Sequence, residues 1–167
     1  MNSGGSNGSV EVRPAGSKGL GAFASRDFAE GETVFQYPSG RLVHIDDVSG
    51  LHPWDYEHLR ELTAETYEVL TAPRCYLNHS CNPNVIDLER RVRAIRPIES
   101  GDELTLDYRM NAHDDGDVWE MVCDCGGEPG PHLVRGDFFS LPDETQRRYL
   151  EWAPEFIRES YARRHTS

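Results

Sequence analysis

The sequence predicts a mainly β protein that ends in a short helical segment. Short apolar and β-branched runs alternate with turns, and the 167 residues include 15 glycines and 10 prolines. Hydrophobic residues make up only 37% of the chain, which fits many short strands better than a helical bundle. Near the C-terminus, Pro142 and Pro154 each suit the start of a helix. The length favours one domain.

In the first half, the expected strands are residues 10–13, 22–24 and 33–37, because each alternates or is rich in β-branched and aromatic side chains. Turns that contain glycine separate them. Residues 41–74 are less regular. Within them, residues 53–62 predict a short helix, since apolar side chains recur near one face at helical spacing.

In the second half, residues 75–77 form a short apolar run that predicts a strand leading into Asn78. Residues 85–88 and 91–95 alternate about a two-residue turn and predict a hairpin. Residues 103–108 predict a further strand. The body is therefore expected to be β-rich, and the helices are expected to follow it.

The net charge of −12 disfavours direct nucleic-acid binding, because phosphate contacts need Lys and Arg. The same field favours a basic partner. Residues 41–74 hold seven acids and three bases (−4), and residues 110–131 hold six acids and no base (−6). Composition alone favours a solvated acidic surface that aids solubility.

The sequence contains no apolar run long enough for a membrane span. Residues 1–9 lack the basic and apolar regions of a secretory signal, and we expect them to be a flexible arm. We therefore expect an intracellular protein, cytoplasmic or, in a eukaryotic or viral setting, nuclear. In that compartment the four cysteines would be reduced, and metal ligation or plain burial explains them better than disulfides.

The run Asn78–Asn84 (NHSCNPN) is polar and follows an apolar segment. Taken alone it indicates an Asx-type turn, because Asn side chains bond their own backbone and Asn-Pro favours a turn. A lone histidine such as His79 is usually structural. Three further motifs stand in order around this run: residues 18–24 (KGLGAFA), 29–37 (AEGETVFQY) and 101–108 (GDELTLDY).

Together the four motifs resemble those of the SET-domain protein-lysine N-methyltransferase family, whose signatures are NHSC-x-PN after an apolar strand and a GEELTxDY-like strand. The resemblance covers roughly residues 10–125. It implies a SET fold of several small curved sheets with a C-terminal pseudoknot. It also implies S-adenosylmethionine on one face, a peptide groove on the other, and a narrow lysine channel between them.

The resemblance divides the chain into a flexible arm (1–9), a SET domain (10–109), a post-SET-like segment (110–135) and a helical tail (136–167). In the family the substrate groove is lined by the segments that correspond to residues 41–74 and 110–131. The two acidic stretches would thus meet a Lys/Arg-rich peptide, which favours a basic protein or peptide as partner over a merely solvated surface.

Methyl transfer to lysine requires a neutral amine, yet the reference pKa of lysine is about 10.4. At pH 7 this deficit costs about 4.6 kcal/mol unless the site helps. A nearby sulfonium cation and an apolar channel both lower the amine pKa. Tyrosine suits such a channel because it is apolar with one polar tip.

The resemblance assigns the catalytic role to Tyr108, which we expect to orient and stabilise rather than to act as a strong base, since its reference pKa is about 10. Tyr37 matches the other channel tyrosine. Ordinary core packing is the alternative for each. Trp119 or Met121 could cover the adenine ring, although core packing explains them equally well.

The predicted cofactor contacts come from two motifs and the tyrosine. Glycine permits a close backbone approach to the cofactor, and the matching positions are Lys18, Gly19, Leu20, Gly21, Asn78, His79 and Tyr108.

The chain departs from the family at the post-SET motif C-x-C-x4-C, whose cysteines bind zinc with the Cys of NHSC. Cys81, Cys123 and Cys125 are present, but the third post-SET position is Gly130. His132, two residues later, could complete a Cys3His zinc site. A metal-free loop with reduced thiols is the alternative.

A second departure is Leu106, two residues before Tyr108, where many members carry Phe or Tyr. It leads us to expect more than one methyl per lysine. The predicted function is S-adenosylmethionine-dependent methylation of a lysine amine in a basic protein or peptide. A SET-like scaffold without turnover, and an enzyme that methylates small-molecule amines, are the alternatives.

Overall fold

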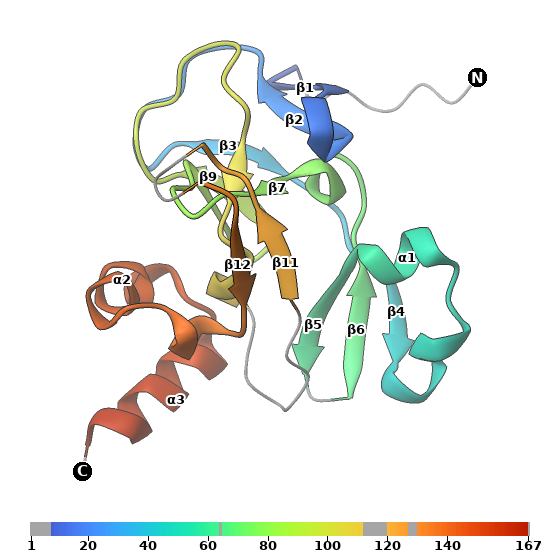
Figure 1. Cartoon of the computed structure of the whole chain (residues 1–167), viewed down its shortest axis with the longest axis vertical. Helices are drawn as coiled ribbons and strands as arrows, with labels where there is room; N and C mark the ends of the chain where they lie inside the picture. Colours follow the sequence, from blue (N-terminus) through green and yellow to red (C-terminus); the bar gives the residue numbers. More distant parts are fainter. Residues whose placement is uncertain (1–7, 64, 112–119, 127–129, 167) are drawn as a thin grey trace.

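The computed structural model describes residues 8–63, 65–111, 120–126 and 130–166. Within them the strands form five small sheets, and two short helices stand at the C-terminal end (Figure 1). The predicted mainly β class with small sheets and a helical C-terminal appendage is therefore confirmed. No helix in this described part has the length and apolarity to cross a membrane.

The sheets are built from short strands. The first pairs β1 (Val10–Pro14) with β2 (Leu20–Ala24). The central sheet has the order β3-β9-β8, with bounds Thr33–Gln36, Arg91–Ala94 and Val85–Leu88. The insert sheet has the order β4-β6-β5, with bounds Arg41–His44, Thr66–Val69 and Leu59–Thr63. The remaining pairs are β7 (Asn78–His79) with β10 (Thr105–Leu106), and β11 (Glu120–Cys123) with β12 (His132–Arg135).

The helices are short. The α-helices are α1 (Pro53–Glu57), α2 (Asp143–Tyr149) and α3 (Glu155–His165). The 3₁₀ helices are η1 (Gly16–Lys18), η2 (Ile45–Gly50), η3 (Arg74–Tyr76), η4 (Tyr108–Asn111), η5 (Phe138–Ser140) and η6 (Leu150–Trp152).

The insert between β3 and β7 is more regular than the sequence indicated. The helix predicted over residues 53–62 ends at Glu57, and Leu59–Thr63 forms β5 instead. Antiparallel pairing with β6 satisfies the backbone groups of β5, and such tertiary pairing overrides a weak local helix pattern.

The strand predicted at residues 75–77 is wrong. Arg74–Tyr76 forms a 3₁₀ helix, in which the Tyr76 amide donates to the Pro73 carbonyl at 3.0 Å. The strand begins only at Asn78. The prediction failed because a short apolar run does not by itself separate a strand from a buried turn.

The predicted hairpin of β8 and β9 is confirmed. Its turn residues Glu89 and Arg90 both have positive φ (51° and 63°), as a two-residue type I′ turn requires. The strand predicted at residues 103–108 is reduced to Thr105–Leu106, which pairs parallel with Asn78–His79.

This parallel pair brings the NHSC motif beside the ELTLDY motif. The Ser80 amide donates to the Leu106 carbonyl at 3.0 Å, and the Asn84 amide donates to the Thr105 carbonyl at 3.1 Å. The loop that follows β7 therefore wraps the strand that leads into Tyr108. The arrangement fixes the positions of both motifs.

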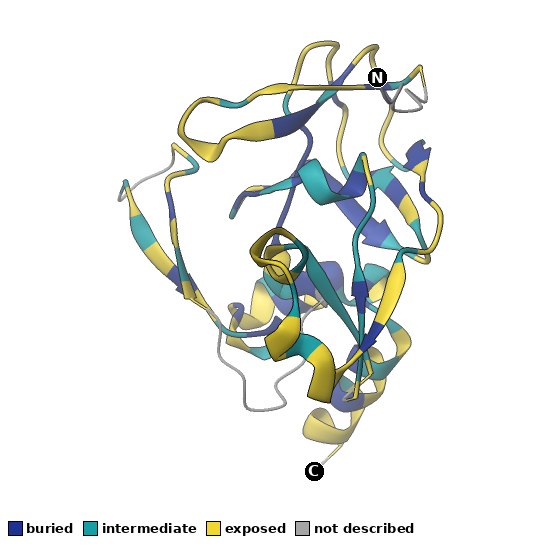
Figure 2. Ribbon diagram, turned by 90° about the vertical axis from the view of Figure 1, so that its right-hand side faces the viewer, coloured by how far each residue is buried: buried dark blue, intermediate teal, exposed yellow. Residues whose placement is uncertain are grey.

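Two buried clusters hold the molecule together, and buried residues concentrate on its inner strands (Figure 2). The first cluster joins β1, β2 and the central sheet. The second contains Ile86 and Met110 from the body together with Phe138, Tyr149 and Ile157 from the tail. The helical tail thus covers one side of the core and contributes to it.

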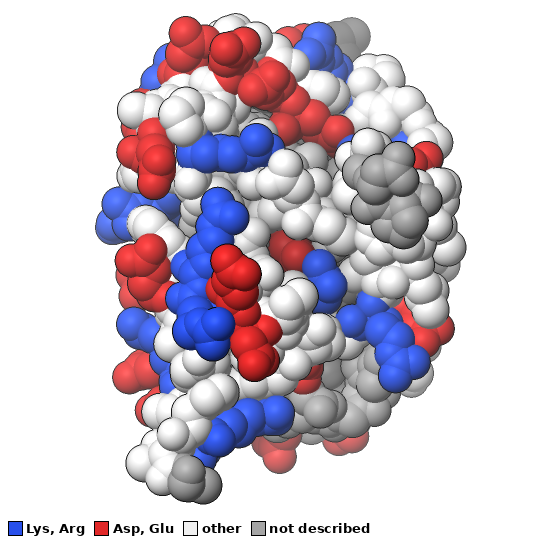
Figure 3. Space-filling model, turned by 60° about the vertical axis from the view of Figure 1, so that its left-hand side comes forward, with Lys and Arg blue, Asp and Glu red and all other residues white. Residues whose placement is uncertain are grey.

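Charge is mixed on the face shown in Figure 3, where Lys and Arg side chains lie among Asp and Glu side chains. The excess of acidic residues therefore does not give this face a single sign.

Candidate active site

A cavity of about 730 Å³ lies between the KGLG turn, β7 and the insert. Its volume falls within the roughly 300–1,000 Å³ that is typical of small-ligand sites. The residues that line it include Lys18, Gly19, Leu20, Asn78 and Tyr108. The structure thus brings together five of the seven residues that sequence predicted as cofactor contacts.

Gly21 and His79, the other two, lie close by. A Cβ added at Gly21 would stand 3.1 Å from Asn78 Nδ2 and 3.0 Å from Glu103 Oε1. These contacts are too tight, so glycine is needed for the backbone to approach Asn78. Gly19 has φ 81°, a conformation that favours glycine. The KGLG turn therefore owes its shape to both glycines.

Glu103 organises the polar end of the cavity. It accepts hydrogen bonds from Lys18 Nζ at 2.8 Å and from Asn78 Nδ2 at 2.8 Å. Asn78 Nδ2 also donates to the Leu20 carbonyl at 3.1 Å. Glu103 lay inside a recognised motif, but sequence reasoning gave it no role.

Tyr108 begins η4 directly after β10, and its hydroxyl donates to the Leu77 carbonyl at 2.9 Å. Burial raises the pKa of Tyr108, and the charge of Arg74 partly offsets the rise. The hydroxyl is therefore neutral at physiological pH and is held by the backbone. Leu106, fully buried, lines the cavity beside Tyr108.

His79 is buried behind the cavity wall. Burial lowers the pKa of His79, so its ring is neutral at pH 7. Nδ1 accepts a hydrogen bond from the Tyr108 amide at 3.2 Å. Consequently Nε2 carries the ring proton, and it faces Cys81 Sγ at 3.4 Å.

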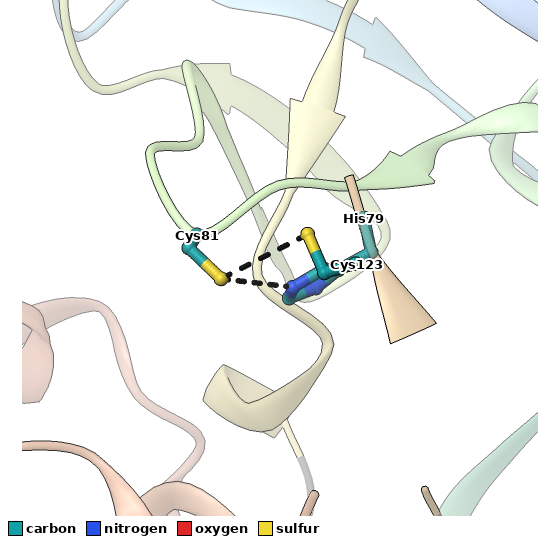
Figure 4. Close-up of side chains that lie close together, drawn as sticks. All are labelled: His79, Cys81 and Cys123. Carbon is teal, nitrogen blue, oxygen red and sulfur yellow. Dashed lines mark hydrogen bonds between the residues drawn. The ribbon is translucent and has the colours of Figure 1, made fainter. Parts of the chain in front are cut away.

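The donor atoms of His79, Cys81 and Cys123 lie within 4.8 Å of one another (Figure 4), and two of these residues, Cys81 and Cys123, are predicted metal ligands. Cys81 Sγ is 4.0 Å from Cys123 Sγ and 3.3 Å from His132 Nε2. Cys125 interacts with Cys123 through its side chain. Burial and the neighbouring Cys123 raise the pKa of the Cys81 thiol to about 12.

Two separations among these donor atoms have the lengths expected of a tetrahedral zinc site. With Zn–S near 2.3 Å and Zn–N near 2.0–2.1 Å, adjacent ligand atoms lie about 3.8 Å (S to S) and about 3.5 Å (S to N) apart. The observed separations of 4.0 and 3.3 Å are close to these values. His132 Nδ1 is 2.9 Å from the Gly130 carbonyl, which can only accept, so Nε2 presents its lone pair to the cluster.

The two histidines therefore have opposite roles. His132 is in the tautomer of a metal ligand, whereas His79 would donate to a thiolate. The tautomers therefore favour His132 over His79 as the nitrogen ligand, although His79 is the histidine whose donor atom lies within 4.8 Å of both Cys81 Sγ and Cys123 Sγ.

Tyr37 is not among the residues that line the cavity, contrary to its predicted place in the channel wall. Its hydroxyl donates to Asp87 Oδ2 at 2.6 Å and accepts from Arg60 Nη1 at 2.7 Å. Burial, together with the Asp87 charge, raises the pKa of Tyr37. Both bonding directions of the hydroxyl are occupied, so Tyr37 supports the wall from behind.

Sequence reasoning missed a buried charge network next to this tyrosine. Asp87 accepts from Arg74 Nε at 2.6 Å, and Glu68 accepts from Arg60 Nη2 at 2.5 Å and from Arg90. Asp87 and Glu68 are fully buried carboxylates. Their signal in the sequence was a charged residue inside each apolar strand, which is rare without a partner.

Fewer acidic residues of the insert line the cavity than the sequence predicted. Asp55 pairs with Arg41, Glu68 is buried, and only Glu57 and Glu61 among the acids of residues 41–74 line the cavity. Much of the second acidic stretch, and Trp119 with it, lies outside the described residues. Met121 does not line the cavity.

A known family has this arrangement of motifs. The SET domain matches residues 19–109, more than half of the chain. The chain belongs to the SET-domain family. This SET domain holds the KGLG turn, the NHSC motif and Tyr108, while β11, β12 and the helical tail follow it.

Several histone-lysine N-methyltransferases are similar to this SET protein. The proteins trr of Drosophila melanogaster and mes-4 of Caenorhabditis elegans are 29% and 28% identical over 126 and 140 residues. Histone-lysine N-methyltransferase 2D of Homo sapiens is 29% identical over 129 residues. The alignments cover 65–66% of this chain but only 5%, 15% and 2% of those proteins.

Proposed function

We propose that the protein is an S-adenosylmethionine-dependent methyltransferase that modifies lysine amines in a basic protein or peptide. One observation carries the proposal: a single cavity is lined by the KGLG turn and Asn78 at one side, by Tyr108, and by α1 and β5 at the other side. A methyl donor and an acceptor side chain could therefore meet at Tyr108. The three relatives named above are histone-lysine N-methyltransferases, which supports a basic protein as the acceptor.

The residues present fit the cofactor. Lys18–Leu20 and Asn78 would hold it, and Gly21 gives the space for that turn to pack. The cofactor supplies a methyl group on a sulfonium. In such a reaction the neutral amine nitrogen would form the new N–C bond as the C–S bond breaks, and the products would be a thioether and a methylammonium that releases a proton to solvent.

The test is transfer of labelled methyl from S-adenosylmethionine to a panel of basic proteins. Label on a protein lysine supports the proposal. A scaffold would bind the cofactor without transfer. An enzyme for small amines would label free alkylamines, and these would compete with the protein acceptors; this outcome would overturn the assignment to protein lysines.

We predict that Leu106→Tyr narrows the product range. Leu106 is fully buried on the cavity wall beside Tyr108, and a larger side chain with a hydroxyl leaves less room for a methylated amine to turn. Mass spectrometry of a time course is expected to show two or three methyls with the natural protein and mainly one with the variant. Leu106→Ile keeps the volume and should keep the natural product pattern. Arrest of the natural protein at one methyl would contradict the expectation.

We also propose that Cys81, Cys123, Cys125 and His132 hold a structural zinc ion. Such an ion would join the NHSC loop to the hairpin of β11 and β12, which comes from well beyond the SET match. Metal binding would replace the thiol protons.

We predict different losses of zinc affinity for the two histidines. His132→Ala removes a ligand, whereas His79→Phe removes only a hydrogen bond to a thiolate, for which a loss of about 10- to 100-fold is typical. Competition with a chromophoric chelator should therefore rank His132→Ala as the weaker binder. The reverse ranking, or no zinc in the natural protein, would contradict the ligand set.

A further inference from the structure

Arg74 presents a buried positive charge to the cavity. Its side chain is 7% exposed and lines the cavity. Its Nε donates to Asp87 Oδ2 at 2.6 Å, which fixes the guanidinium from behind. Among the described residues none accepts a hydrogen bond from the terminal nitrogens of Arg74, so that end of the guanidinium is the part that meets the cavity.

The charges around Arg74 do not cancel this effect at the cavity wall. The network holds Arg60, Arg74 and Arg90 against Glu68 and Asp87, so its net charge is 3 − 2 = +1. Both Arg60 and Arg74 line the cavity, whereas Asp87 and Glu68 do not. Of the five charged groups of this network, the two that line the cavity are therefore both cations.

Tyr37 and Cys75 are neutral because burial raises their pKa values. Tyr108 faces the same cavity, and Arg74 lies near enough to act on it electrostatically. The remaining charged or titratable groups of the wall, apart from Arg60, are Lys18, Tyr56, Glu57, His58, Glu61, Tyr67 and Tyr76, and Lys18 is paired with Glu103.

We propose that Arg74 keeps the acceptor lysine deprotonated, because its fixed positive charge near Tyr108 disfavours an ammonium and leaves a neutral amine unaffected. The inference rests on the proposed lysine methyltransferase function and adds a residue to it. A sulfonium gives similar help only while the methyl donor is bound. Arg74 stays charged throughout the pH range of an assay.

The test compares the pH dependence of kcat for Arg74→Met and for the natural protein. Removing the cation raises the amine pKa in the complex, so the acid limb of the profile should move up by about one pH unit, a loss of roughly tenfold at pH 7. The two rates should converge near pH 10. Arg74→Lys keeps the charge and should keep most of the natural profile.

Arg90→Met is the matched control, since Arg90 belongs to the same network and does not line the cavity; its acid limb should not move. Arg74→Met leaves Asp87 with fewer partners, so the double variant Arg74→Met/Asp87→Leu provides a folded alternative, with thermal unfolding as the check. The double variant should shift the acid limb in the same direction but by less, because it removes the negative charge of Asp87 as well.

An unmoved acid limb in the folded variants would overturn the role of Arg74 while leaving the methyltransferase function standing. A cofactor affinity at least tenfold weaker in Arg74→Met would also overturn it, because Arg74 would then hold the cofactor's carboxylate. If the natural protein methylates no basic protein even at high pH, both proposals fail.

Discussion

Replacement of Tyr108 by phenylalanine is expected to lower kcat for methyl transfer by about 100- to 1,000-fold, the usual cost of removing one preorganised polar group at a reacting centre. The affinity for the cofactor should change less than about twofold, because packing of the ring stays the same. Isothermal titration with the cofactor and a labelled-methyl assay measure the two quantities.

The geometry of Tyr108 gives the reason. Its hydroxyl proton is directed at the Leu77 carbonyl, so the oxygen lone pairs are the part left to face a cationic methyl and the amine. The raised pKa of Tyr108 makes it a poor base at neutral pH. We therefore expect Tyr108 to stabilise positive charge and to align the amine rather than to act as a base.

Tyr161→Phe, on α3 and remote from the cavity, is the control and should leave kcat unchanged. A loss below tenfold for Tyr108→Phe would remove Tyr108 from the reaction. A large loss in cofactor affinity without a loss in kcat would make it a binding residue instead.

Sequence alone predicted the parts of the fold that local patterns determine. The hairpin of β8 and β9 followed from two alternating runs, and the tail helices followed from Pro142 and Pro154. The insert could not be predicted in this way. Its strand β5 forms because β6 pairs with it. The sequence of β5 itself carries only a weak strand pattern, so this pairing could not be predicted locally.

The site shows the same division. The motifs singled out Lys18, Asn78 and Tyr108, and the structure places all three at one cavity. They could not show that the Tyr37 hydroxyl turns to Asp87, because the carboxylate that attracts it lies 50 residues away in the chain. A buried acid in the VIDL strand was visible in the sequence, but its partners were not.

The zinc ligands illustrate a third case. Spacing suggested His132 as the fourth ligand but gave no means to decide between it and a metal-free loop. The structure adds the tautomer argument, since the Gly130 carbonyl fixes one ring and the Tyr108 amide fixes the other. Such hydrogen bonds follow from backbone positions that no sequence pattern specifies.

Replacement of Asp87 by leucine is expected to destabilise the protein by about 3–5 kcal/mol, because it removes the shared partner of buried cations. Asp87 Oδ2 accepts hydrogen bonds from Tyr37, Arg74 and Arg60. The change therefore leaves Arg74 with no hydrogen-bond acceptor in the described part of the chain. For a chain of this length the melting temperature should fall by about 10 °C. Chemical denaturation measures the free energy directly.

The double variant Arg74→Met/Asp87→Leu distinguishes two quantities. One is the net contribution of the ion pair to the free energy of unfolding, and the other is the loss of stability when only one partner is removed. Replacing both members of a buried ion pair by apolar residues is often neutral or stabilising, so most of the lost stability should return. If the double variant is as unstable as Asp87→Leu, packing at this position matters more than the charge. Another outcome is that the double variant folds well and shows a pH profile shifted in the direction expected for Arg74. In that case the protein does not need the ion pair for stability, and the pair matters for the charge that it places at the cavity.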